Sequence, residues 1–146
     1  MKNVFIIEDD VNILYGLRDI FSSNDYEVET SDSNEELEDI LARIRKFQPK
    51  IIVLDLVLPK LDGLEIIKKI KEDDAISDAE IFIFTDLSEE DGRSRSVGLG
   101  ANYYFMKNEF DVYTFSNKVM RIMERSGKEF EKNDDSVEDS NDIVMD

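Results

Sequence analysis

The chain has 146 residues, of which 41% are hydrophobic and 36% are charged, and this size favours one domain with a full-sized core. Its net charge of −17 argues against direct binding to nucleic acids or anionic membranes, because phosphate groups would repel such a surface. The absence of Cys and His excludes disulfides, thiolate or imidazole metal sites and Ser–His–Asp catalysis.

The first ten residues, MKNVFIIEDD, carry a short apolar run at 4–7 that is followed at once by acids. This run is too short for the core of a signal peptide, and no other stretch approaches the length of a transmembrane span. We therefore expect a cytoplasmic protein that makes no membrane contact. By its length and β-branching, 4–7 is predicted to be a short buried strand.

Apolar residues then recur at the spacing of an amphipathic helix, at Ile13, Leu14, Leu17, Ile20 and Phe21. Residues 26–30 (YEVET) alternate between polar and apolar, which is typical of an edge strand. Ser33 and Glu36 have the spacing of a capping box, which predicts the start of a second helix. Pro49 is expected to stop that helix.

The second half of the chain continues the alternation of strands and helices. Three further strands are predicted, at 51–54 (IIVL), 81–84 (IFIF) and 102–106 (NYYFM). A third helix is expected after the loop 56–62, and a weaker fourth at 88–100, with Ser88 as its cap. A fifth is expected to follow the candidate cap Asp111.

Five repeats of strand and helix predict an α/β fold, with right-handed connections and a doubly wound parallel sheet covered by helices on both faces. The three purely apolar strands are expected at its centre. Residues 127–146 hold eight acids and two lysines, a net charge of −6. We interpret 1–126 as the folded domain and 127–146 as an acidic disordered tail or the start of a linker.

Polar side chains follow several strands of the predicted sheet. They are Glu8, Asp9 and Asp10 after the first strand, Asp55 after the third, Thr85 after the fourth and Lys107 after the fifth. Each residue alone has an ordinary explanation as a turn, a cap or a surface charge. Because ligands of open α/β sheets bind at the carboxyl ends of the strands, their joint placement predicts a functional site.

Crowded carboxylates repel one another and favour a bound cation, and hard oxygen ligands favour Mg²⁺. An aspartate carboxylate can also act as a nucleophile and form an aspartyl phosphate. In that chemistry Mg²⁺ would neutralise the transferred phosphoryl group, while Lys107 would pair with its oxygens and Thr85 would hydrogen-bond one of them.

Other phosphate chemistries fit less well. VGLGAN (97–102) has two glycines spaced like a dinucleotide-binding loop, but it lacks the third and precedes a strand. No Walker A sequence is present. A phosphohydrolase of the aspartyl-phosphate type usually has a second acid two residues after the nucleophile, where this chain has Val57.

Four segments in this order resemble the CheY-like receiver domain of response regulators in two-component signalling. They are FIIEDD (5–10), IIVLDLVLPKLDGLE (51–65), FTD (84–86) and YYFMK (103–107). The resemblance covers about residues 1–125 and implies a flavodoxin-like fold with strand order 2-1-3-4-5. It also makes Asp55 the phosphoacceptor. Asp9 would bind Mg²⁺ directly and Glu8 nearby, through water, and the backbone carbonyl of Val57 would complete the protein ligands.

The resemblance further makes Thr85 and Tyr104 the switch residues and Lys107 the lysine that pairs with the phosphate. Two positions depart from the family pattern. Asp86 stands where the family usually has a small residue after the switch threonine, and Asn108 replaces the proline that usually follows the lysine.

Because the chain has no His, the phosphoryl group would come from a separate histidine kinase or histidine phosphotransfer protein. A downstream protein would bind the face formed by the fourth helix, fifth strand and fifth helix, and a homodimer is a further expectation. The domain would not be an enzyme beyond its own phosphorylation and dephosphorylation. The alternative is a pseudo-receiver scaffold of the same fold, with Asp86 and Asn108 as signs of lost switching.

Overall fold

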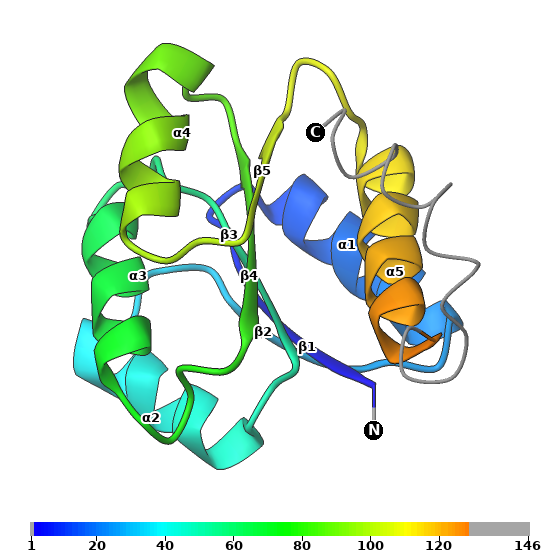
Figure 1. Ribbon diagram of the computed structural model, residues 1–146, viewed down its shortest axis with the longest axis horizontal. Coiled ribbons are helices and arrows are strands. Elements are labelled where there is room, and N and C mark those ends of the chain that lie inside the picture. The colour runs from blue at the N-terminus through cyan, green and yellow to red at the C-terminus, as the bar shows by residue number, and fades with distance from the viewer. Residues whose placement is uncertain (1, 129–146) are drawn as a thin grey trace.

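The computed structural model describes residues 2–128, in which strands and helices alternate along the chain (Figure 1). The strands are β1 (Asn3–Ile7), β2 (Glu27–Ser31), β3 (Ile51–Leu54), β4 (Glu80–Thr85) and β5 (Tyr103–Met106). The helices are α1 (Val11–Ser23), α2 (Leu37–Phe47), α3 (Gly63–Glu72), α4 (Glu89–Gly98) and α5 (Val112–Lys128). All ten predicted elements are present, and the strand boundaries differ from the predicted ones by one residue at most.

The five strands form one parallel sheet in the order β2-β1-β3-β4-β5. This order confirms the doubly wound, flavodoxin-like arrangement. The central strands β1 and β3 are buried along their whole length, and β4 is buried from Ile81 onward. β2 lies at the edge and is mostly half-exposed, as its alternating sequence predicted.

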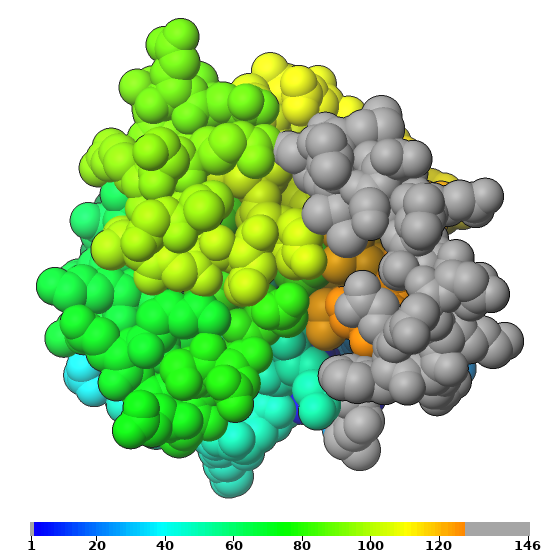
Figure 2. Space-filling view, viewed as in Figure 1, coloured from blue at the N-terminus to red at the C-terminus, as the bar shows by residue number. Residues whose placement is uncertain are grey.

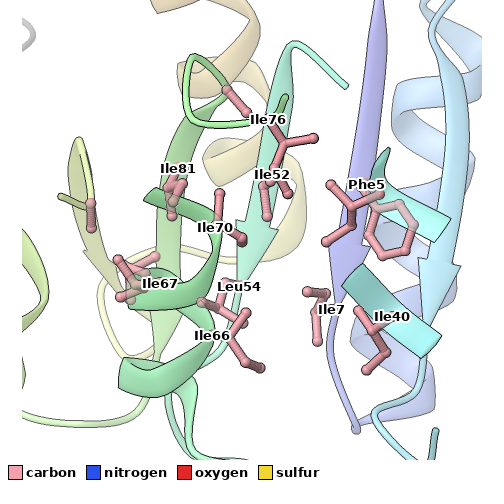
Figure 3. Close-up of a cluster of buried hydrophobic side chains, with 14 of the residues drawn as sticks. Phe5, Ile7, Ile40, Ile52, Leu54, Ile66, Ile67, Ile70, Ile76 and Ile81 are labelled. Atoms are coloured by element: carbon pink, nitrogen blue, oxygen red, sulfur yellow. The ribbon is translucent and has the colours of Figure 1, made fainter. Parts of the chain in front are cut away.

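Apolar clusters cover both faces of the sheet, because successive side chains of a strand point to opposite faces. Phe5 and Ile7 of β1 point toward α2 and α3, where they join one cluster (Figure 3). Val4 and Ile6 of the same strand belong to the other cluster, with residues of α1 and α5. Figure 1 shows the same layers, with α2, α3 and α4 on one side of the sheet and α1 and α5 on the other.

The predicted capping box of α2 is wrong. Ser33 is buried with a left-handed φ of 68°, and its N–H donates to Oγ of Ser31 at 3.0 Å. This turn keeps Ser33 away from the helix, which begins only at Leu37, and Glu36 at the N-cap makes no side-chain capping bond. The helix ends before Pro49, as predicted.

The other predicted caps are confirmed. Ser88 Oγ accepts from the N–H of Asp91 at the start of α4, and Asp111 Oδ1 accepts from the N–H of Thr114 at the start of α5. α5 continues to Lys128, so its last two residues lie in the predicted tail. The rest of that tail, 129–146, lies outside the described residues. Within residues 2–128, every helix is too short or too polar to cross a membrane.

Asp10→Ala tests the start of α1. Asp10 Oδ1 accepts from the N–H groups of Asn12 and Ile13 at 3.0 and 3.3 Å. Losing this cap should lower the free energy of unfolding by about 1 kcal/mol in urea titrations. Asp19→Ala, an exposed change in the same helix, is the control and should stay within about 0.5 kcal/mol of the parent. Equal effects of the two changes would contradict the capping role.

Candidate functional site

Asp55 follows β3 directly and is 4% exposed. Its N–H donates to the carbonyl of Ile7 at 3.2 Å, so the pairing of β1 and β3 continues into the site. One carboxylate oxygen, Oδ1, accepts from the N–H of Val57 at 3.0 Å, and the other accepts from Lys107 Nζ at 2.8 Å. The charge at the end of this apolar strand is therefore buried with two donors.

Glu8 occupies the equivalent position after the neighbouring strand β1 and is 1% exposed. Its Oε1 lies 2.9 Å from Lys107 Nζ, and its Oε2 accepts from the N–H of Asp10 at 3.1 Å. Lys107 comes from β5, beyond β4, so its side chain must cross the end of β4. There its ammonium lies 6.0 Å from the ring centroid of Phe84. A single ammonium thus bridges two buried carboxylates.

The two acids and one lysine alter each other's protonation. Burial, and then the negative charge of Asp55, raise the pKa of Glu8 from 4.5 to about 7, against the opposing effect of Lys107. Burial alone would lower the pKa of Lys107, but its hydrogen bonds to Asp55 and Glu8 outweigh burial and raise it. Lys107 is therefore a fixed positive charge, whereas Glu8 can gain or lose a proton near neutral pH.

Asp9 adds a third, solvent-exposed carboxylate. Oxygens of Glu8, Asp9 and Asp55 all lie within 4.8 Å of one another. Three hard oxygen donors at one solvent-accessible edge suit a cation such as Mg²⁺, which keeps several of its waters. Asp10 points elsewhere, because its carboxylate caps α1. Two of the three consecutive acids therefore belong to the site and one belongs to the helix.

Thr85 ends β4 beside these residues and is fully buried. Its carbonyl accepts from the N–H of Lys107 at 2.8 Å, and its Oγ1 accepts from the N–H of Leu87 at 3.3 Å. Asp86 and Asn108, the two departures from the family pattern, are both exposed. Neither prevents Lys107 from reaching the carboxylates.

Tyr104 connects β5 to the segment that follows Thr85. The ring is buried, and its hydroxyl lies 2.7 Å from the carbonyl oxygen of Leu87 and 3.2 Å from that of Ser88. The guanidinium of Arg93 in α4 lies 5.3 Å from the ring centroid. The hydroxyl of Tyr104 therefore fixes the position of the turn between β4 and α4 through these hydrogen bonds.

Gly92 is a site residue that the sequence did not reveal. A Cβ at this position would collide with the hydroxyl of Tyr104, and it would lie 2.9 Å from Cζ of the same ring and 3.0 Å from Cδ2 of Leu87. The tyrosine can thus occupy its buried position only because residue 92 has no side chain. In the sequence, Gly92 is visible only as a residue that weakens a helix.

Gly63, at the start of α3, lies very close to the backbone of the segment that carries Asp55. A Cβ there would lie 2.5 Å from Cα of Leu56 and 3.0 Å from the carbonyl oxygen of Asp55. α3 can therefore begin against the segment that carries Asp55. Of the predicted site residues, Glu8, Asp9, Asp55 and Lys107 converge. The ligand role of the Val57 carbonyl stays a prediction.

The sequence matches a known family and related regulators. Residues 4–115 match the family described as the response regulator receiver domain. The alkaline phosphatase synthesis transcriptional regulatory protein PhoP of Bacillus subtilis (strain 168) is 30% identical over 125 residues, which are 86% of this chain and 50% of PhoP. The probable transcriptional regulator ycf27 of Porphyra purpurea is 28% identical over 127 residues, which are 87% of this chain and 49% of ycf27. The chain spans about half the length of the curated relatives it matches.

Solved structures share the fold. A response regulator receiver domain protein (CheY-like) from Methanospirillum hungatei JF-1 has a TM-score of 0.74 at 23% identity, over 88% of this chain and 98% of that one. The response regulator DrrB of Thermotoga maritima, an OmpR/PhoB homologue, has a TM-score of 0.72 at 27% identity, over 86% and 54% of the two chains.

Gly92→Ala should displace Tyr104. The added methyl group overlaps the tyrosine hydroxyl, so we expect loss of its contacts with Leu87 and a fall of about 1–3 kcal/mol in the free energy of unfolding. Nuclear Overhauser effects between the Tyr104 ring and the Leu87 methyl groups, together with urea titrations, measure both effects. Gly98→Ala in the same helix is the control, because a Cβ there meets nothing within 4 Å. Identical behaviour of the two variants would disprove the steric argument.

Glu8 should make stability depend on pH. Its pKa is higher in the folded protein, at about 7, than its ordinary value of 4.5. The folded state therefore binds this proton more tightly, and the free energy of unfolding should fall as pH rises through that interval, by roughly 3 kcal/mol in full. Glu8→Gln cannot titrate and should show a flatter profile between about pH 5 and pH 8 without divalent cations. Parallel profiles for parent and variant would remove Glu8 as the cause.

Proposed function

Because the chain belongs to the response regulator receiver domain family, we propose that it is a phospho-accepting signalling domain. Asp55 receives a phosphoryl group from a partner histidine kinase or histidine phosphotransfer protein. An oxygen of Asp55 forms the new bond to phosphorus as the bond between phosphorus and the donor imidazole nitrogen breaks, and the nitrogen keeps the electron pair. The domain takes part in its own phosphorylation and dephosphorylation and has no other enzymatic activity.

The observation that carries this proposal is the placement of Lys107 between two buried carboxylates. Its Nζ lies 2.8 Å from Oδ2 of Asp55 and 2.9 Å from Oε1 of Glu8. A lysine in this position can pair with the Asp55 carboxylate before transfer and with the oxygens of a phosphoryl group on Asp55 after transfer. The Asp55 oxygens also lie at the carboxyl ends of the strands, where open α/β sheets bind their ligands.

Mg²⁺ is the cofactor that fits this site. Asp9, Asp55 and the backbone carbonyl of Val57 would hold it, and Glu8 would act through water. The clustered oxygens of Glu8, Asp9 and Asp55 support this assignment, because one lysine cannot neutralise three carboxylates. When bound, the ion would neutralise negative charge on the phosphoryl group during transfer.

The signal would leave the site through Thr85 and Tyr104. Thr85 would bond a phosphoryl oxygen and pull on the turn that Tyr104 holds, which would change the face formed by α4, β5 and α5. Val97 and Leu99 near the end of α4 and Tyr113 of α5 are exposed apolar residues that suit a protein partner or a second copy. Figure 2 shows the surface of α4 exposed at the upper left of the molecule.

The relatives PhoP and ycf27 are named as transcriptional regulators. We propose that this domain serves such a regulator through protein contacts. Its net charge of −17 opposes direct contact with nucleic acid phosphates.

A pseudo-receiver scaffold is the second candidate. The exposed carboxylate of Asp86 beside Thr85 favours it, since this charge would repel an incoming phosphoryl group.

Asp55→Asn tests the proposal. With Mg²⁺ and beryllofluoride, a mimic of the aspartyl phosphate, the parent protein should bind the mimic saturably, and this variant should not bind it. Fluorine NMR of the bound fluorides measures binding directly. Asp86→Asn is the matched control and should bind at least as well as the parent. Failure of the parent to bind would support the scaffold, and binding by Asp55→Asn would place the acceptor elsewhere.

The phosphorylated state should be long-lived. Hydrolysis needs a water in line with phosphorus, opposite the Asp55 oxygen. The side chains of the flanking residues Val57 and Leu87 cannot hydrogen-bond such a water, and Val57 is 53% exposed. Each orienting hydrogen bond of about 1 kcal/mol would speed hydrolysis roughly fivefold.

Val57→Asn and Leu87→Glu should therefore shorten the lifetime, measured as the decay of phosphorylated protein in Mg²⁺. Leu99→Glu adds the same charge just after α4, away from the site, and should leave the decay unchanged. If neither flanking change speeds the decay, the apolar shield is not what limits hydrolysis.

A further inference from the structure

A hollow of about 500 Å³ lies at the amino ends of the strands, opposite the carboxylate cluster. Lys2, which precedes β1, and Lys50, which precedes β3, line it together with Tyr26 and Ile51. Met120 and Met123 of α5 line the other wall. We call this feature the amino-end hollow. The proposed function makes no use of it.

The amino-end hollow combines an apolar lining with positive charge. Its lining includes three cationic side chains, Lys2, Lys50 and Arg121, against the single acid Glu124. The ammonium of Lys2 lies 5.6 Å from the ring centroid of Tyr26. This balance is unusual in a chain with a net charge of −17. The chemistry that fits is an acidic peptide with apolar side chains, and methionine walls adapt readily to such a ligand.

The chain itself contains such a peptide. Residues 129–146 hold eight acids and one lysine, a net charge of −7, and they end in Asp142–Asp146 (DIVMD). In an extended peptide Ile143 and Met145 point to the same side, and two aspartates flank the apolar residues. The carboxyl ends of the strands would repel this segment through Glu8, Asp9 and Asp55, whereas Lys2 and Lys50 would attract it.

The connection is long enough. Met123 lies five residues before Lys128, about 8 Å along α5. In Figure 1 this end of α5 lies near the start of β1, in agreement with the shared lining of the hollow by Lys2 and Met123. From Lys128 to Ile143 an extended chain spans up to about 50 Å, which is ample for a return to the hollow. Because a tethered segment acts at a high effective concentration, modest contacts suffice to hold it.

We propose that the amino-end hollow is an intramolecular docking site for the acidic segment 129–146. Ile143 and Met145 enter among Tyr26, Met120 and Met123, and the flanking aspartates pair with Lys2 and Lys50.

The absence of Cys from the sequence makes the test direct. In the full chain, Ser140→Cys gives one attachment point for a nitroxide spin label, and Met and Ile methyl groups are followed by NMR. The methyl signals of Met120, Met123 and Ile51 should lose intensity until the nitroxide is reduced, and this loss should not change on dilution. Ile66 in α3, on the opposite face of the sheet, should keep its intensity.

Two double variants and one matched control identify the cause of the intensity loss. Lys2→Glu with Lys50→Glu should restore the intensities, and Lys68→Glu with Lys69→Glu, the matched change on exposed lysines of α3, should not. Ile143→Ser with Met145→Ser should also restore them and leaves the folded domain untouched. Full intensity in the parent, or a loss that survives both restoring changes, would overturn the proposal. Broadening that appears only when labelled and unlabelled chains are mixed would assign the hollow to a second copy instead.

Discussion

The ion pairs of Lys107 with Asp55 and Glu8 are the interaction on which the site depends. A parallel sheet brings the ends of β1 and β3 side by side, and each strand is followed directly by a carboxylate that is almost fully buried. Two such charges without a partner would be costly in a buried setting. Lys107 reaches both because its backbone N–H is fixed by the carbonyl of Thr85, at the end of the intervening strand. Removing this lysine would leave both carboxylates uncompensated, so the arrangement proposed for phosphoryl transfer also supports the fold.

The same geometry explains how the site can be coupled to a distant surface. Thr85 holds Lys107 through its carbonyl and Leu87 through its side-chain oxygen, and Leu87 in turn accepts from the hydroxyl of Tyr104. These contacts form a short continuous chain from the carboxylates to α4. The chain has one point of steric control, at Gly92, where any side chain would occupy the space of the tyrosine hydroxyl. A displacement at Thr85 can therefore reach α4 without a change in the core of the sheet.

The sequence predicted those features that a residue pattern specifies without a competing alternative. Continuous apolar runs predicted the central strands, and side chains that follow parallel strands share one edge of the sheet, so the burial of β1, β3 and β4 and the convergence of Glu8, Asp55 and Lys107 were predictable. The strand order followed from the resemblance to receiver domains and is confirmed. It failed where local patterns compete. Ser33 and Glu36 have the spacing of a capping box, but a left-handed turn at Ser33 prevents it. The role of Gly92 depends on a contact with β5, twelve residues away in sequence, which no local pattern encodes.

The charged residues at the two ends of β1 and β3 would keep the proposed phosphoryl chemistry apart from the proposed docking of an acidic peptide. Glu8, Asp9 and Asp55 gather at the carboxyl ends of β1 and β3, where a cation and a phosphoryl donor would approach, whereas Lys2 and Lys50 stand immediately before the same two strands. The neighbouring strands β2 and β4 begin with Glu27 and Glu80, so this positive charge is local to the lining of the amino-end hollow. Parallel strands make this polarity possible, because all their amino ends lie at one edge and all their carboxyl ends at the other. An acidic peptide would thus be repelled from the edge where the phosphoryl chemistry is proposed and attracted to the amino-end hollow. Under the proposed docking, the acidic segment 129–146 would lie away from the carboxylates and would not compete with them for Lys107.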